Sequence, residues 1–273
     1  MKFVKILAAA GLTVAMAYGT AMAIPSEQIA IPSTDAKGFK EVTLNVISTQ
    51  RFSTKADAGA SSYDAGVLVG VLPFESLKLE IGFDYLTSNL QFDTHADNHP
   101  FYFNAKLATP EDLGFKGMPA FAVGVYNLGT YDKPELAAPG LGNSTRQDLA
   151  YGLVAKTLPV IGRLSAGGYV GAKRALANGS NTINTNQNSG VMVSWDRGIT
   201  EISDKLWLGI DYMSGNNANG ELGIGGSWAF TKQVTLLAGV QTFNPGYKLS
   251  AGDQGFIPGG KPAFTTQLFI NLP

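Results

Sequence analysis

The sequence predicts an all-β fold, a closed antiparallel up-and-down barrel of twelve strands. Apolar and polar residues alternate within segments of about ten residues from residue 41 onward, and a period of two is typical of strands. The connections between these segments alternate between short and mostly longer ones. Between them, no stretch shows the three-and-four spacing of an amphipathic helix.

The number of predicted strands is even, as in bacterial single-chain barrels. In chain order they are EVTLNVISTQRF, YDAGVLVGVL, LKLEIGFDYLT, FYFNAKLA, AFAVGVYNLG, DLAYGLVAKTL, RLSAGGYVGAK, GVMVSWD, KLWLGIDYM, ELGIGGSWAF, VTLLAGVQTF and AFTTQLFINL.

The order of the connections favours a barrel over a soluble sandwich. The even-numbered ones are PFES, TPEDLGFKGMP, PVIG, RGITEIS and TKQ, whereas the others include SNLQFDTHADNHP and the Asn-rich RALANGSNTINTNQNS. Outer-membrane barrels join their strands by short periplasmic turns and longer extracellular loops. A soluble, secreted all-β protein such as a lectin-like sandwich stays the alternative, although it has no reason to sort its loops in this way.

Within each strand one face is apolar and the other is polar. A Lys or Arg at the middle of a bilayer costs about 2–4 kcal/mol, and no charge falls in mid-strand on the apolar face. We therefore predict that the apolar face meets lipid and the polar face lines a wet lumen. The charged residues expected along the ion or solute path are Arg51, Asp64, Lys78, Glu80, Asp84, Lys106, Lys156, Arg163, Lys173, Asp211 and Glu221.

Aromatic residues at the strand ends are predicted to form two girdles at the membrane interfaces, where amphipathic rings are favoured. One outward girdle holds Tyr63, Tyr85, Phe101, Tyr151, Tyr212 and Phe264, and the other holds Phe121, Trp195, Trp228 and Phe230. The same alternation places large inward groups at Tyr102, Tyr126 and Tyr169.

The N-terminus is predicted to be a cleaved signal peptide over residues 1–23. Lys2 and Lys5 precede an apolar run, and Ala21-Met22-Ala23 has the A-x-A pattern of a cleavage site. A retained membrane anchor helix is the alternative, disfavoured because the apolar run is short. A polar, Pro-containing periplasmic lead segment is expected over residues 24–40, and the barrel over residues 41–273.

Composition excludes several classes of function. Only 15% of the residues are charged and the formal net charge is −1, so no basic surface indicates nucleic acid. The chain has no Cys, which removes disulfides, cysteine zinc sites and thiol catalysis. No cofactor is expected, and the glycine-rich stretches fit neither a phosphate-binding loop nor a dinucleotide fingerprint.

With its signal peptide, alternating segments and loop order, the sequence resembles the bacterial outer-membrane β-barrels, a small porin-like class, over nearly all of its length after residue 23. The resemblance implies a Gram-negative outer-membrane location, with membrane lipids and small polar solutes or ions as partners. Most members end in a terminal aromatic residue, whereas this chain ends FINLP, with Phe269 set back and assigned inward. The oligomeric state is left open.

The first functional hypothesis is passive diffusion of ions or small polar solutes through a narrow lumen. Eight strands leave an interior filled by side chains and sixteen to eighteen leave an aqueous channel, so twelve lie between. The predicted lumen charges carry both signs in similar number, and pairing among them would brace the wall. Weak selectivity and a small conductance are therefore expected.

A second hypothesis is an outer-membrane hydrolase, such as a lipid A deacylase or a phospholipase. Ser88 and His99 could form a nucleophile and base across one hairpin, but the alternation places Ser88 inward and His99 outward. Asp93, His95, Asp97 and His99 could bind a metal, although a loop gives their spacing little specificity. We therefore expect no catalytic residue and no metal site.

A third hypothesis is a structural or adhesive barrel with partner-binding loops. The loop ANGSNTINTNQNSG, residues 177–190, could be recognised by a partner, but a flexible solvated loop explains the same composition.

Overall fold

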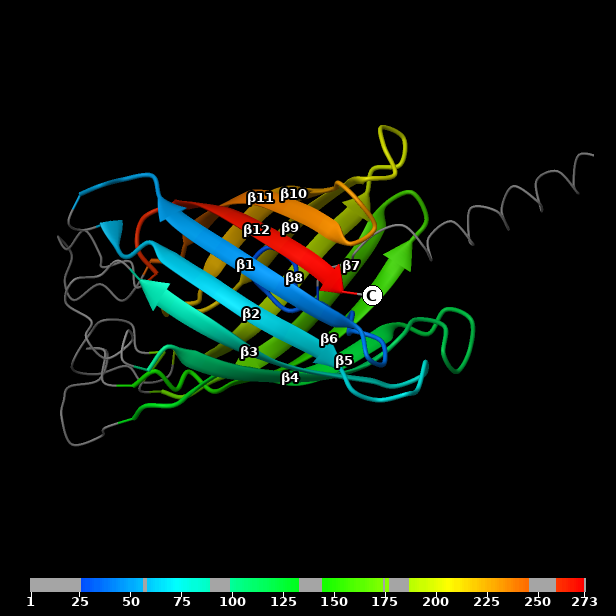
Figure 1. Ribbon diagram of the computed structural model, residues 1–273, viewed down its shortest axis with the longest axis horizontal. Helices are drawn as coiled ribbons and strands as arrows, with labels where there is room; N and C mark the ends of the chain where they lie inside the picture. The colour runs from blue at the N-terminus through cyan, green and yellow to red at the C-terminus, as the bar shows by residue number, and fades with distance from the viewer. Residues whose placement is uncertain are drawn as a thin grey trace, which may run out of the picture.

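The computed structural model describes residues 26–55, 58–88, 99–132, 144–173, 175–176, 187–245 and 259–272. Within these ranges twelve strands form one closed barrel, in which every strand pairs antiparallel with its neighbours in the chain and β1 pairs with β12 (Figure 1). The predicted fold and strand number are confirmed.

The strands are β1 (Val42–Arg51), β2 (Ser62–Gly70), β3 (Lys78–Ser88), β4 (Phe101–Thr109), β5 (Ala120–Gly129), β6 (Leu149–Leu158), β7 (Gly162–Val170), β8 (Ser189–Gly198), β9 (Leu206–Met213), β10 (Glu221–Ala229), β11 (Val234–Phe243) and β12 (Ala263–Leu272). Among the described residues, no helix is long and apolar enough to cross a membrane.

The two ends of the barrel differ in their connections. At one end, here called the short-turn end, lie residues 71–77, 110–119, 159–161, 199–205 and 230–233. At the other, here called the long-loop end, lie the strand ends that flank residues 52–61, 89–100, 130–148, 171–188, 214–220 and 244–262. The chain ends at the short-turn end, on the right of Figure 1.

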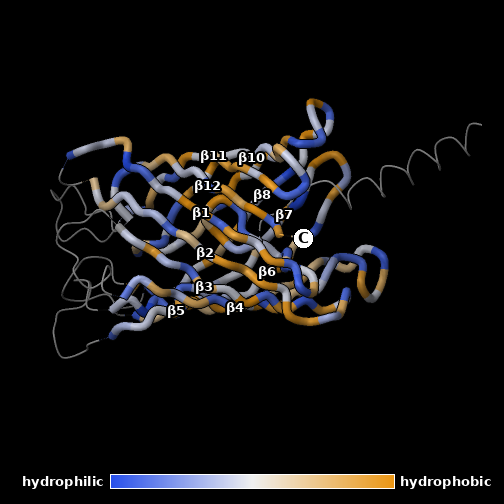
Figure 2. The backbone as a smooth tube through the Cα atoms, in the orientation of Figure 1, coloured by the Kyte–Doolittle hydropathy of each residue, from blue (hydrophilic) through white to orange (hydrophobic). Residues whose placement is uncertain are grey.

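The wall has an apolar outer face and a largely polar inner face. On β1, Thr43 and Asn45 are buried inside at 1% and 4% exposure, whereas their neighbour Val46 is 51% exposed on the outside. Orange and blue positions alternate along the strands in Figure 2, as the side chains turn outward and inward in succession. In the described strands the charged face points inward, as predicted, apart from Lys156 and Arg197 near the strand ends.

The aromatic residues predicted for the two girdles lie on the outward rows at the two ends of the barrel, except Tyr151. Tyr63, Tyr85, Phe101 and Phe264 are exposed towards the long-loop end, and Phe121, Trp228 and Phe230 are exposed towards the short-turn end. Tyr151 was wrongly assigned outward: it is buried inside, in line with Leu149 and Leu153 of β6, because the odd-numbered residues of this strand face the lumen. Tyr212 and Trp195 are half-buried on the outward rows.

The last strand is anchored by the closure of the barrel. Val42 of β1 pairs with Leu272 of β12, and the pairing continues without a shift to Arg51 and Ala263. Phe269 is 2% exposed and faces inward, so the predicted orientation of this residue is confirmed.

The barrel is not empty. Residues 26–37 belong to the predicted lead segment and alone carry that name from here on. They fold back as a tight hairpin inside the barrel. In this hairpin a bridge joins Glu27 to Pro32, and the backbone N–H of Gln28 donates to the Ile31 carbonyl at 2.8 Å. This hairpin is part of the blue trace seen within the ring of strands in Figure 1.

Candidate functional site: a lumen bridged by the lead segment

The lead segment crosses the lumen from β3 to β9. These strands lie six places apart in a ring of twelve, on opposite sides of the barrel. Residues at both ends of the segment bond to Glu80 of β3, and its tip bonds to Asp211 of β9. A backbone bridge therefore spans the bore.

Asp211 fixes the tip of the hairpin. One oxygen of its carboxylate accepts the backbone N–H groups of Ile29, Ala30 and Ile31 at 2.8, 2.7 and 3.2 Å. Asp211 is 1% exposed, and the bonds from Ile29 and Ile31 are buried, while that from Ala30 is partly buried. Hydrogen bonds to a charged acceptor are stronger than neutral ones, and a buried N–H without a partner is costly. The pattern makes Asp211 the main polar anchor of the tip.

Glu80 holds both ends of the segment. Its carboxylate accepts the hydroxyl of Ser26 and, at 3.0 Å, the backbone N–H of Lys37. The ammonium of Lys106, on β4, pairs with Glu80 at 3.5 Å and donates to the Ser26 carbonyl. Glu80 and Lys106 are both buried, and they neutralise each other where the segment meets the wall.

A second polar cluster binds the segment on β7 and β8. The amide of Gln28 donates to the carboxylate of Asp196 at 2.9 Å, and the guanidinium of Arg163 donates to the same oxygen at 2.9 Å. Arg163 also pairs with Asp35 of the lead segment, while the indole N–H of Trp207 donates to the other oxygen of Asp196 at 3.1 Å.

Two isoleucines add apolar contacts. Ile29 is buried in a cluster with Trp207, Leu237 and Phe269. Ile31 is buried in a larger cluster whose other members are Leu149, Tyr151, Leu153, Tyr169, Leu176, Met192 and Met213. Leu149 and Met213 lie at the long-loop ends of their strands, so the hairpin reaches well into the barrel.

Two glycines make room for the segment. A Cβ atom at Gly223 of β10 would lie 2.9 Å from the side chain of Ile29. A Cβ atom at Gly70 of β2 would lie 1.8 Å from the backbone oxygen of Gly38, where the chain leaves the lumen for β1. Because the second neighbour is backbone, which cannot swing aside, a side chain at Gly70 is incompatible with this path.

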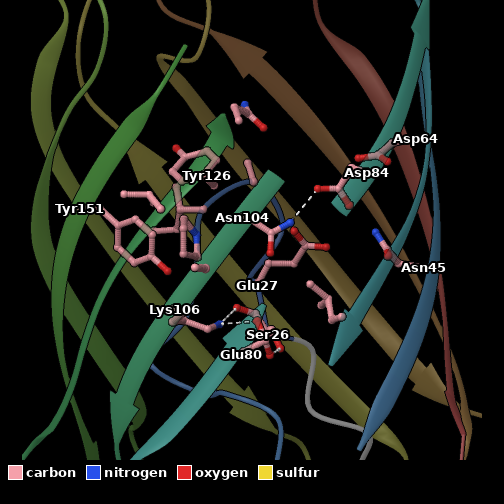
Figure 3. A pocket seen from close by; sticks show the side chains of 17 residues that line it. Ser26, Glu27, Asn45, Asp64, Glu80, Asp84, Asn104, Lys106, Tyr126 and Tyr151 are labelled. Atoms are coloured by element: carbon pink, nitrogen blue, oxygen red, sulfur yellow. Dashed lines mark hydrogen bonds and ion pairs between the residues drawn. The ribbon is translucent and has the colours of Figure 1, made fainter. Parts of the chain in front are cut away.

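Beside the hairpin lies a cavity of about 210 Å³, bounded by the lead segment and the wall of β1 to β6 (Figure 3). Acidic and amide side chains face it from one side and two tyrosines from the other: Glu27, Asn45, Asp64, Glu80, Asp84 and Asn104 against Tyr126 and Tyr151. Burial, and then the nearby carboxylate of Asp84, raise the pKa of Glu27 to about 7. The cavity is partly polar, and its lining holds more carboxyl groups than basic groups.

Most of the predicted lumen residues lie inside the barrel. Glu80, Lys106, Asp211 and Glu221 are buried there, and Arg51, Asp64, Lys78, Asp84 and Arg163 are half-buried on the inward rows. The cavity collects Asp64, Glu80, Asp84 and Lys106. Arg51 instead braces the long-loop end, where its guanidinium donates to the carbonyls of Ala60 and Lys261, each at 2.6 Å.

Two predicted lumen residues are placed elsewhere. Lys156 pairs across the sheet with the exposed Leu164 on the outer face, and its ammonium bonds to Glu111 and Asp112 of the turn after β4, at 2.8 and 3.0 Å. Its orientation was predicted wrongly, as was that of Tyr151, because the prediction exchanged the inward and outward rows of β6. Lys173 is exposed in the connection after β7, beyond the strands.

The sequence predicts a lead segment over residues 24–40 and leaves open whether it enters the lumen. In the structure, residues 26–37 lie inside the barrel. One signal was available: Ile29 and Ile31 alternate with polar and small residues in IPSEQIAIPSTDAK, as in the strands. Asp196, which no predicted role singled out, is a central contact of the segment.

Asp93, His95 and Asp97 of the metal hypothesis lie outside the described residues, whereas Ser88 and His99 of the hydrolase hypothesis lie within them. Residues 177–186 of the Asn-rich loop 177–190 are also outside the described ranges. The ring of His99 stacks on that of Tyr131, with centroids 4.5 Å apart. Within the described ranges, no group of three His, Cys, Asp or Glu residues is arranged to hold a metal ion.

Comparison with known proteins gives similarity in structure only. No known protein family and no curated protein matches the sequence. Among solved structures, the chain is similar to an outer membrane channel from Pseudomonas putida F1, with a TM-score of 0.47 and 11% identity over 92% of this chain and 100% of that one. It is also similar to outer membrane phospholipase A from Escherichia coli, with a TM-score of 0.44 and 12% identity over 84% and 90% of the two chains.

A porin variant from Rh. blastica is similar with a TM-score of 0.36 and 12% identity, over 94% of this chain and 68% of that one. These proteins carry outer-membrane or porin names. Because a channel and a phospholipase both occur among them, this similarity does not distinguish a channel from an enzyme.

Proposed function

We propose that the protein is an outer-membrane channel of narrow bore, through which ions or small polar solutes diffuse passively beside a lead segment fixed in the lumen. The observation that carries the proposal is the polar cavity left between the lead segment and the wall of β1 to β6. A barrel that served only as a structural anchor would have no need of a polar cavity next to a backbone bridge.

The outer face supports the membrane location. In the described strands, Lys156 and Arg197 are the charged residues on outward rows. Both lie near the short-turn end, where each pairs with a carboxylate of a turn, Glu111 and Glu201 respectively. The middle of the outer face is therefore free of charge in the described strands, as a lipid environment requires. In this setting the short-turn end faces the periplasm.

The lead segment supports a narrow bore. Its contacts with Glu80, Asp196 and Asp211 fasten it at both ends and at the tip, so it reduces the free cross-section at this level. Beside it lies the cavity, whose lining offers carboxylates, amides and phenol groups to a passing solute. A small conductance follows from this geometry.

Single-channel recording tests the proposal. The folded protein and a variant lacking residues 26–37 are inserted into planar lipid bilayers, and heat-modifiable migration on a detergent gel establishes that both are folded. We expect small current steps for the wild type and clearly larger ones for the variant, because the bridge across the bore is gone. Folded barrels that insert and never conduct would refute the channel.

A further inference from the structure

We infer that the cavity beside the lead segment binds a small organic cation, of the alkylammonium class. The inference deepens the proposed function and rests on it, because it names the class of solute that the channel takes. It concerns the side chains of β1 to β6 that face the hairpin, and Glu27 of the hairpin itself.

Three carboxylates face the cavity without a cation of their own. Glu27 comes from the lead segment, Asp64 from β2 and Asp84 from β3. In the part of the chain that the structure describes, no Lys or Arg forms an ion pair with any of them. Lys106, the basic residue in the lining, is engaged by Glu80 and the Ser26 carbonyl. Carboxyl groups thus outnumber basic groups around the space that a solute would fill.

Unused hydrogen-bond acceptors point to a ligand independently of this charge. Asn45 is 4% exposed and lines the cavity, and its side-chain oxygen accepts no hydrogen bond. One carboxylate oxygen of Asp64 is likewise buried without a partner. Buried acceptors without partners are rare in folded proteins because they lose their bonds to water. An ammonium group, which carries three donors and accepts nothing, complements such a set.

The opposite side of the cavity suits the carbon chain of the ligand. Tyr126 and Tyr151 line it, with their rings packed edge to face at 5.7 Å between centroids. Leu68, Val125 and Ile31 add apolar surface. Aromatic faces attract organic cations, and the apolar groups accommodate their methylenes. The volume of about 210 Å³ is below the roughly 300–1,000 Å³ of pockets for drug-sized ligands, so the ligand is small.

A bound divalent metal is a poorer fit. Ca²⁺ and Mg²⁺ need several oxygen ligands converging at about 2.0–2.6 Å. In the described part of the chain, no group of three His, Cys, Asp or Glu side chains is arranged to hold a metal ion. Carboxylates on one side of the cavity and aromatic rings on the other match a cation with an extended body.

Calorimetric titration of the detergent-solubilised, folded full-length protein with butylammonium tests the inference. Butanol and butyrate serve as the uncharged and anionic probes of the same length. We expect butylammonium alone to bind, and its dissociation constant to rise roughly tenfold or more in the double variant Asp64→Asn/Asp84→Asn. The matched control Glu201→Gln removes an exposed turn carboxylate and should leave binding unchanged.

If the double variant does not fold, Glu27→Gln removes one carboxylate without touching the wall, and it should weaken binding in the same direction. Equal binding of butanol or butyrate, an unchanged affinity in the folded variants, or full displacement of butylammonium by Mg²⁺ would each overturn the inference. If the protein conducts but does not bind butylammonium, the inference is refuted and the proposed channel function stands. If it binds butylammonium but never conducts, the proposed channel function alone is refuted.

Discussion

The carboxylate of Asp211, on β9, accepts the backbone N–H of Ala30 at 2.7 Å from the tip of the lead segment. The same oxygen accepts the N–H groups of Ile29 and Ile31. Replacement by alanine, Asp211→Ala, leaves these buried donors without their acceptor, at roughly 1–3 kcal/mol for each group. We expect the tip to leave its seat and the single-channel current to rise towards that of the variant lacking residues 26–37.

The control for this variant is Glu201→Ala, which removes a carboxylate that pairs with Arg197 in the turn after β8 and does not touch the lead segment. Its current should equal that of the wild type. An unchanged current in folded Asp211→Ala would show that the three hydrogen bonds do not hold the bridge in place.

The outer face gives a second prediction. Ile224 is 51% exposed at the middle of β10, on the row assigned to lipid. In vesicles, Ile224→Lys should lower the free energy of unfolding by about 2–4 kcal/mol, the cost of a lysine near the bilayer midplane. Ile202→Lys is the matched control, because Ile202 is exposed in a turn at the short-turn end. Equal stability of both variants in urea titrations would contradict a lipid-facing wall.

The third prediction concerns pH. Burial and the neighbouring Asp84 raise the pKa of Glu27 from its ordinary value of 4.5 to about 7. Between these values the folded protein keeps a proton that the unfolded chain has released, so the free energy of unfolding falls as the pH rises through this window. The charged groups acting on Glu27 are Asp84, Lys106, Glu80 and Lys37, and Glu27 in turn acts on Asp64.

The variant Glu27→Gln lacks this titration. Without added amine, it should match the wild type in stability at pH 4 and exceed it at pH 8, as measured by urea unfolding in vesicles at both values. The difference between the two proteins cancels the titration of groups that they share. A variant less stable than the wild type at pH 8 would mean that ionised Glu27 is favourably solvated or paired in the lumen.

The architecture could be predicted because each strand carries its own signal. A period of two decides which residues share a face, and the cost of a charge in lipid decides which face is outside. Lys78, Glu80 and Asp84 of β3 show this, since all three lie on the inward row that their spacing predicts. Phe269 was likewise placed inward from alternation alone, and the structure gives the reason in its contact cluster with Ile29.

In β6 the local pattern was ambiguous. One row holds Tyr151, Leu153 and Ala155, and the alternate row, with Val154, is also largely apolar. The single charged residue, Lys156, therefore determined which row was assigned to the lumen, and the assignment was wrong. That lysine lies at the rim, where the turn carboxylates Glu111 and Asp112 satisfy it outside the lumen. A charge near a strand end is therefore weak evidence for orientation.

The site was only partly predictable. Wall carboxylates such as Asp64 and Asp84 were recognisable as inward groups, but nothing local in the sequence shows that Gln28 meets Asp196 or that Ala30 meets Asp211. These contacts join residues more than a hundred and sixty positions apart, and they depend on the closure of the barrel around the segment. The acidic cavity exists only once this hairpin is seated.

A reducible cross-link tests the central claim, that solutes pass beside a fixed lead segment, most directly. The side-chain tips of Gln28 and Asp196 meet at 2.9 Å, and the chain has no natural Cys to interfere. Because a direct disulfide needs Cβ atoms about 3.5–4.5 Å apart, the two thiols of the double variant Gln28→Cys/Asp196→Cys are joined by a short bis-thiosulfonate reagent, whose disulfide bonds a reductant cleaves. We predict single-channel currents that persist in the cross-linked protein and do not change when the cross-link is reduced. Currents that vanish on cross-linking and return on reduction would contradict the account, because passage would then require the segment to leave the lumen.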